Sequence, residues 1–87
     1  MRRKAIVMGA TSGVGREVAW LLAERGWKVG IAGRRAERLE EVVRESENIV
    51  CCQQIDVTSP DAPELLRRLI ERLGGMDLYF HNSGIGW

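Results

Sequence analysis

The residues best suited to chemistry are the glycines near the start of the chain. Residues 9–15 read Gly-Ala-Thr-Ser-Gly-Val-Gly, and they lie between a short apolar run and a segment with helical periodicity. Glycines in such a turn let the backbone approach a pyrophosphate, and the helix that follows offers free N–H groups and the positive end of its dipole. A purely structural turn would also use glycine, but the flanking elements favour dinucleotide binding. The residues predicted to bind the dinucleotide here are Gly9, Thr11, Ser12, Gly13, Val14 and Gly15.

A second candidate group is the basic pair Arg34 and Arg35, which follows the second apolar run. Sites for NAD typically carry a carboxylate at this point, where it accepts a hydrogen bond from the ribose 2′-OH. A guanidinium instead attracts a 2′-phosphate, which a carboxylate would repel. The alternative interpretation is that both arginines simply begin a solvated helix. The missing acid and its basic replacement favour NADP over NAD, and Arg16 is expected to add charge from the first helix.

Polar segments also follow the third and fourth apolar runs: Asp56-Val57-Thr58, and His81-Asn82-Ser83-Gly84. With the spacing Gly-x-x-x-Gly-x-Gly, they make the whole chain resemble the short-chain dehydrogenase/reductase family. The resemblance implies adenine contacts by Asp56 and Val57, and further cofactor contacts by Asn82, Ser83 and Gly84. His81 and Ser83 depart from the family's Asn-Asn-Ala-Gly pattern.

The same resemblance implies a catalytic Tyr, a Lys four residues after it, and a Ser upstream of both. The only tyrosine, Tyr79, is followed four residues later by Ser83, and the only lysines are Lys4 and Lys28. Tyr79 is expected to pack in a strand and His81 to flank the motif, so no catalytic residue is predicted.

We therefore expect the NADP(H)-binding portion of an oxidoreductase, truncated before its catalytic segment and inactive by itself. In the complete fold, hydride would pass between NADP(H) and an alcohol or carbonyl substrate. One alternative is a non-catalytic NADP(H)-binding or sensing module, and another is a self-associating interaction fragment. Retention of the glycine turn with Arg34, Asp56 and Asn82 favours the two nucleotide-binding functions.

The elements that must position these residues alternate between apolar runs and amphipathic segments, as in βαβ units. Strands are predicted at 5–8, 28–32, 49–55 and 76–80, and helices at 14–25, 36–43 and 60–73. The predicted fold is one α/β domain over residues 1–87, the N-terminal half of a Rossmann-type doubly wound parallel sheet. Right-handed crossovers give the strand order 3-2-1-4, with the first two helices on one face and the third on the other.

Composition excludes several classes of function. A net charge of +1 over 87 residues gives no electrostatic reason to expect binding to nucleic acid or membrane. The sequence has neither a signal-peptide pattern nor the ~20 consecutive apolar residues of a membrane span. Cys51 and Cys52 lack the spacing of a metal site and are expected to be reduced thiols on opposite faces of a strand, in a cytoplasmic protein.

Two surfaces also have expected properties. The arginines Arg67, Arg68 and Arg72 recur on a segment whose other side is apolar, so they are expected to form a solvated helix face. The fourth strand carries few charges and lies at the open edge of the expected sheet. Such an edge invites strand pairing with another chain, so a homo-oligomer, with a dimer as the simplest case, is predicted.

Overall fold

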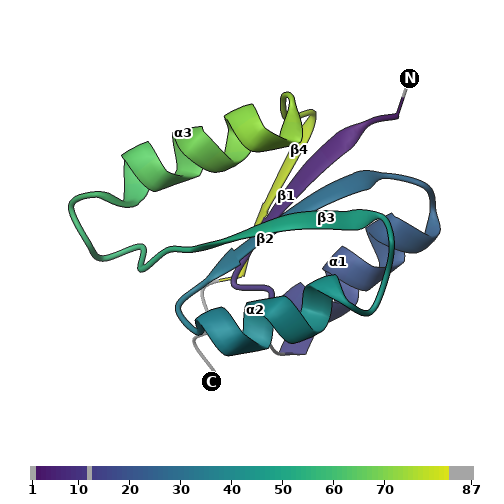
Figure 1. The fold of residues 1–87 in the computed structure, drawn as a ribbon, viewed down its shortest axis with the longest axis horizontal. Helices are drawn as coiled ribbons and strands as arrows, with labels where there is room; N and C mark the ends of the chain where they lie inside the picture. The colour runs from purple at the N-terminus through teal and green to yellow at the C-terminus, as the bar shows by residue number, and fades with distance from the viewer. Residues whose placement is uncertain (1, 12, 83–87) are drawn as a thin grey trace.

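The computed structural model describes residues 2–11 and 13–82 and shows a parallel four-stranded sheet with three helices (Figure 1). The strand order is β3-β2-β1-β4, as predicted. The strands are β1 (Lys4–Met8), β2 (Lys28–Gly33), β3 (Ile49–Gln54) and β4 (Leu78–His81). The helices are α1 (Gly13–Glu24), α2 (Ala36–Val43) and α3 (Ala62–Leu73).

Two element boundaries differ by two residues from the sequence-based prediction, and several others differ by one. β4 begins at Leu78 rather than Met76, and the preceding Asp77 instead exchanges hydrogen bonds with Lys4. The backbone N–H of Asp77 donates to the Lys4 carbonyl (2.7 Å), and the N–H of Lys4 donates to the Asp77 carboxylate (2.8 Å). α3 begins at Ala62 rather than Pro60, because a turn precedes it in which the Ser59 N–H donates to the Asp56 carbonyl (2.9 Å).

The helices divide between the two faces of the sheet as predicted, with α1 and α2 on one face and α3 on the other (Figure 1). Neighbouring strand residues point to opposite faces, so Val7 joins the α1/α2 core while Ile6 joins the α3 core. Likewise Cys52 packs against the first core and Cys51 against the second. The expected opposite orientation of the two free thiols is therefore confirmed.

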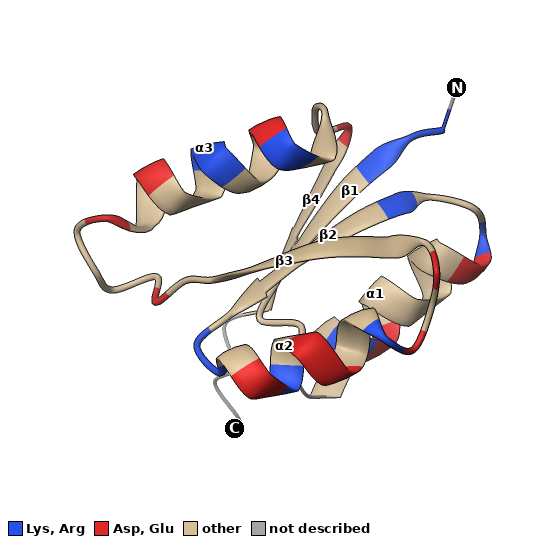
Figure 2. Ribbon diagram, viewed as in Figure 1, with Lys and Arg blue, Asp and Glu red and all other residues tan. Residues whose placement is uncertain are grey.

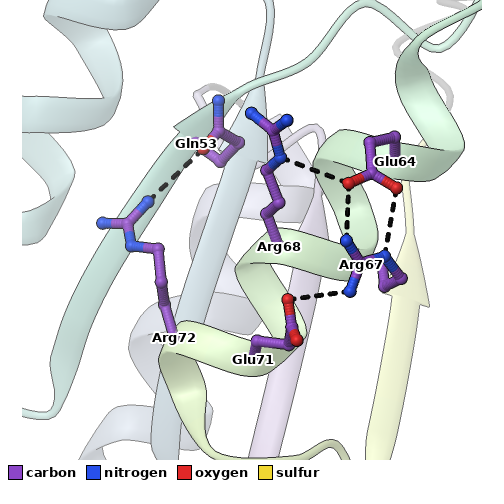
Figure 3. A network of polar contacts seen from close by, with 6 residues as sticks. All are labelled: Gln53, Glu64, Arg67, Arg68, Glu71 and Arg72. Carbon is purple, nitrogen blue, oxygen red and sulfur yellow. Dashed lines mark hydrogen bonds and ion pairs between the residues drawn. The ribbon is translucent and has the colours of Figure 1, made fainter.

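α3 carries both acidic and basic residues (Figure 2), and on its outer face they form a network of exposed ion pairs (Figure 3). Arg67 contacts Glu64 at 2.6 Å and Glu71 at 2.9 Å, and Arg68 also reaches Glu64. Arg72 donates to the Cys52 carbonyl at 3.0 Å. The prediction of a solvated charged face is confirmed, and such exposed pairs contribute little to stability.

The described residues contain neither a helix that could span a membrane nor a group of side chains that could hold a metal ion. In residues 2–11 and 13–82, none of the helices has the length and apolar character needed to cross a membrane. Within the same ranges, no cluster of three or more His, Cys, Asp or Glu side chains is placed to hold a metal ion.

Candidate functional site

The carboxyl ends of all four strands meet at one edge of the sheet, where they surround an open pocket of about 230 Å³. In open α/β sheets this edge is where ligands bind. The lining residues come from every strand end: Met8, Gly9 and Thr11; Gly33, Arg34 and Arg35; Ile55 and Val57; His81 and Asn82. Four segments that are distant in sequence thus contribute to a single site.

The glycine turn lies against the end of β4 with its backbone in close contact. Gly9 has φ +79°, and a Cβ on it would lie 2.2 Å from the Asn82 carbonyl oxygen. A Cβ on Gly15 would lie 2.1 Å from the Gly9 carbonyl oxygen. Both positions therefore require glycine, and the turn contributes Gly9 and Thr11 to the lining of the pocket.

Asn82 connects the turn to the sheet. Its backbone N–H donates to the Met8 carbonyl (2.9 Å), and its side-chain amide donates to the Gly9 carbonyl (3.3 Å). The Gly9 N–H in turn donates to the Ala32 carbonyl of β2 (2.8 Å). These bonds fix the turn across three strand ends, so Asn82 both lines the pocket and holds its shape.

The basic side of the pocket is formed by Arg34 and Arg35, in the loop between β2 and α2 (Figure 2). Both side chains are exposed, and neither forms a salt bridge to a carboxylate within the described ranges. Arg35 precedes α2 without making a side-chain capping bond, and the Arg34 carbonyl accepts a bond from Gln54 (3.0 Å). The two guanidinium groups are therefore available to an anionic ligand.

Arg16 is placed differently from the expectation that it adds charge to this site. Its guanidinium pairs with Glu45, just beyond α2, through two hydrogen bonds, one of them with an N–O distance of 3.3 Å. It is not among the residues that line the pocket. The charge of Arg16 is therefore directed toward the end of α2.

After β3, Asp56 and Val57 have different roles. The Asp56 carboxylate accepts bonds from the Thr58 hydroxyl (2.7 Å) and the Thr58 N–H (3.0 Å), and these lower the pKa of Asp56, with a smaller effect from Arg34. Asp56 thus shapes the loop, while the exposed Val57 lines the pocket.

The remaining predicted residues are placed as follows. Val14 and Gly13 belong to the first turn of α1 and do not line the pocket, and Val14 is 63% exposed. Ser12, Ser83 and Gly84 lie outside the described residues.

The residues that sequence reasoning did not assign to the site are Met8, Gly33, Ile55 and His81. Their shared position at or beside strand ends is the signal that could have identified the first three.

Tyr79 and His81 form a hydrogen-bonded pair on β4. The Tyr79 hydroxyl lies 3.0 Å from His81 Nδ1, and both side chains are exposed. The strand assignment of Tyr79 is confirmed, but its ring is only partly covered. His81 also lines the pocket.

The fold and the pocket together define a Rossmann-type domain with a site for a nicotinamide dinucleotide. Residues 3–87 match the family model described as short chain dehydrogenase, and the chain belongs to that family.

Similarity to known oxidoreductases supports the assignment to this family. The chain is 42% identical over 84 residues to an uncharacterized oxidoreductase of Listeria innocua, covering 92% of this chain and 34% of that protein. It resembles the actinorhodin polyketide ketoreductase structure with NADPH (TM-score 0.85, 32% identity), covering 97% of this chain and 34% of the other. It also resembles an alcohol dehydrogenase of Thermococcus sibiricus complexed with 5-hydroxy-NADP (TM-score 0.89, 26% identity), covering 100% and 39%. The chain therefore spans about a third of the length of its relatives.

Proposed function

We propose that this chain binds NADP(H) in preference to NAD(H), as the cofactor-binding portion of an oxidoreductase. The observation that carries the proposal is the pocket itself, which joins the glycine turn to Arg34 and Arg35 and has no carboxylate among its described lining residues. The NADPH and 5-hydroxy-NADP in the two similar structures support the same choice of cofactor.

Each part of the site has a task in this proposal. The backbone around Gly9 and the start of α1 receive the pyrophosphate, Arg34 and Arg35 pair with the 2′-phosphate, and Val57 contacts the adenine. When bound, the cofactor supplies hydride transfer, which in the complete family fold would act on an alcohol or carbonyl substrate. Asn82 contributes by holding the turn that receives the phosphates.

The proposal assigns binding rather than catalysis to these 87 residues. Lys4 and Lys28 begin β1 and β2, at the end of the sheet opposite to the pocket, and the Tyr79 hydroxyl is engaged with His81. A non-catalytic NADP(H)-binding or sensing module is the second candidate, and it would use the same pocket. The free thiols of Cys51 and Cys52 support a reducing compartment such as the cytoplasm.

The first prediction concerns the choice of cofactor. Arg34→Ala should weaken NADP(H) binding by about 10- to 150-fold, because a charge-assisted hydrogen bond contributes about 1.5–3 kcal/mol. NAD(H) binding should change by less than about two-fold, since NAD(H) has no 2′-phosphate to pair with. Titration calorimetry with both cofactors measures this difference.

Arg38→Ala is the matched control, because Arg38 is an exposed arginine of α2 that does not line the pocket. It removes the same side chain and the same charge, and should leave both affinities nearly unchanged. An equal loss for both cofactors in Arg34→Ala, or no loss, would contradict the assignment of Arg34 to the 2′-phosphate.

We also propose that the isolated chain self-associates through β4, which is an edge strand of the four-stranded sheet. Met76, Leu78 and Tyr79 leave about 40% of their surfaces exposed beside that edge. Unpaired N–H and C=O groups next to apolar side chains favour pairing with a second copy.

The second prediction therefore concerns assembly. Light scattering across a dilution series should show a dimer that dissociates on dilution, and Leu78→Lys should shift it toward the monomer because a charge opposes edge pairing. Val50→Lys, on the opposite edge strand β3, is the control for charge alone. The proposed interface would be contradicted by a wild-type chain that is monomeric at high micromolar concentration. It would also be contradicted if Leu78→Lys and Val50→Lys shifted the chain toward the monomer equally.

A further inference from the structure

The single histidine and the single tyrosine of the chain lie two residues apart on β4. In the sheet, Tyr79 pairs with Ile6 and His81 pairs with Met8, and both partners belong to the core on the α3 side. Side chains two apart on a strand share a face, so the phenol and the imidazole lie side by side on this face. His81 is one of the two residues of this segment that depart from the family pattern Asn-Asn-Ala-Gly.

The contact between the two rings is specific. The Tyr79 hydroxyl lies 3.0 Å from His81 Nδ1, and the rings are tilted by 33° with their centroids 6.0 Å apart. Partial burial raises the pKa of Tyr79, so the phenol keeps its proton at neutral pH and can donate it. A phenol oxygen is a weak acceptor because its lone pair is delocalised into the ring, so donation from Tyr79 to Nδ1 is the favoured arrangement. A neutral imidazole with an acceptor at Nδ1 carries its hydrogen on Nε2.

His81 also lines the same pocket as Arg34 and Val57. When Arg34 pairs with the 2′-phosphate, the ribose that carries this phosphate and the adenine attached to it lie in this pocket. Adenosine offers ring nitrogens and ribose oxygens as hydrogen-bond acceptors. No carboxylate among the described lining residues competes for the histidine N–H.

We propose that His81 is a further cofactor-binding residue, which donates from Nε2–H to an acceptor on the adenosine half of the dinucleotide. Tyr79 is the positioning residue, since its hydroxyl fixes the imidazole in the tautomer that donates. The inference rests on the proposed NADP(H) site and adds to it a contact that does not depend on the 2′-phosphate.

The tautomer can be measured directly, because ¹⁵N NMR of a chain with one histidine yields a single imidazole. The wild type should show the hydrogen on Nε2, and Tyr79→Phe should give a mixture of tautomers. Titration with 2′,5′-ADP should shift the Nε2 resonance of the wild type. An Nδ1–H tautomer, or an Nε2 resonance unmoved by saturating 2′,5′-ADP, would overturn the inference even if every variant failed to fold.

Two adenosine probes then separate this contact from the one made by Arg34. His81→Ala should weaken 2′,5′-ADP and 5′-AMP by the same factor, about 2- to 12-fold for one hydrogen bond. Tyr79→Phe should give a smaller loss in the same direction. Arg34→Ala should weaken 2′,5′-ADP alone. His81→Gln should retain more affinity than His81→Asn, because a Gln amide nitrogen reaches the position of Nε2 and an Asn amide nitrogen that of Nδ1.

The outcomes distinguish the two proposals. If Arg34→Ala selectively loses 2′,5′-ADP while His81→Ala binds both probes like the wild type, the NADP(H) site stands and the role of His81 is refuted. If the wild type binds both probes equally tightly, the 2′-phosphate assignment fails, whereas an equal loss in His81→Ala still supports the adenosine contact.

Discussion

Replacing Gly15 with alanine is expected to lower the free energy of unfolding by about 3 kcal/mol or more and to remove NADP(H) binding. The added Cβ would lie 2.1 Å from the Gly9 carbonyl oxygen and 3.0 Å from the side-chain nitrogen of Asn82. That carbonyl accepts the Asn82 hydrogen bond, so neither group can move without opening the turn. In an 87-residue domain with a total stability of roughly 4–13 kcal/mol, such a loss is a large fraction.

Gly13→Ala is the control that separates steric clash from backbone conformation. Gly13 has φ +59°, but among the described residues no atom beyond its chain neighbours and its own helix backbone lies within 4 Å of the added Cβ, so its substitution costs the left-handed strain of about 1–2 kcal/mol. Urea unfolding followed by circular dichroism gives both values. Equal losses at the two positions would show that close backbone packing is not what requires Gly15.

Much of the fold could be predicted because its signals are local. The run Ala5-Ile6-Val7-Met8 is apolar at every position, as in a strand covered on both faces, and the structure buries all four residues. The spacing of Leu69 and Leu73 likewise indicates the inner face of α3. Once the elements are known, right-handed crossovers leave few strand orders, and the predicted order is the observed one.

The two boundaries that sequence reasoning placed two residues too early depend on particular side-chain hydrogen bonds, one between residues distant in sequence and one local. β4 starts at Leu78 because the Asp77 side chain accepts a bond from the Lys4 N–H, 73 positions away in sequence. The start of α3 depends on a turn in which the Ser59 hydroxyl also donates to Asp61 at 2.5 Å. Neither bond has a counterpart in hydrophobic periodicity.

The same distinction applies to the site. Gly9, Arg34 and Asn82 could be predicted because they follow strands within motifs, and all three line the pocket. Arg16 also lies in a motif, but the packing of α1 beside α2 brings it to Glu45. The position of His81 in the pocket depends on the register between β4 and β1, which cannot be derived from the motif alone.

Leu69→Ala is expected to produce the other large effect, a loss of about 2–5 kcal/mol in unfolding free energy. Leu69 is fully buried, and α3 is the helix that covers its face of the sheet. Gly30 of β2 lies below it, where a Cβ would be 3.5 Å from Leu69 Cδ1. Because Gly30 has no side chain that could fill the space, truncating Leu69 would leave a cavity over the strand.

Leu21→Ala is the matched control, since it shortens a leucine on α1 that is 46% exposed and should cost far less. No residue of α3 lines the pocket, so the folded fraction of Leu69→Ala should bind NADP(H) with nearly the wild-type affinity. Thermal unfolding should show a melting temperature lower by roughly 8–40 °C, at 4–8 °C per kcal/mol for a domain of this size. Similar melting temperatures for the two variants would mean that α3 is not the cover on which this face of the sheet depends.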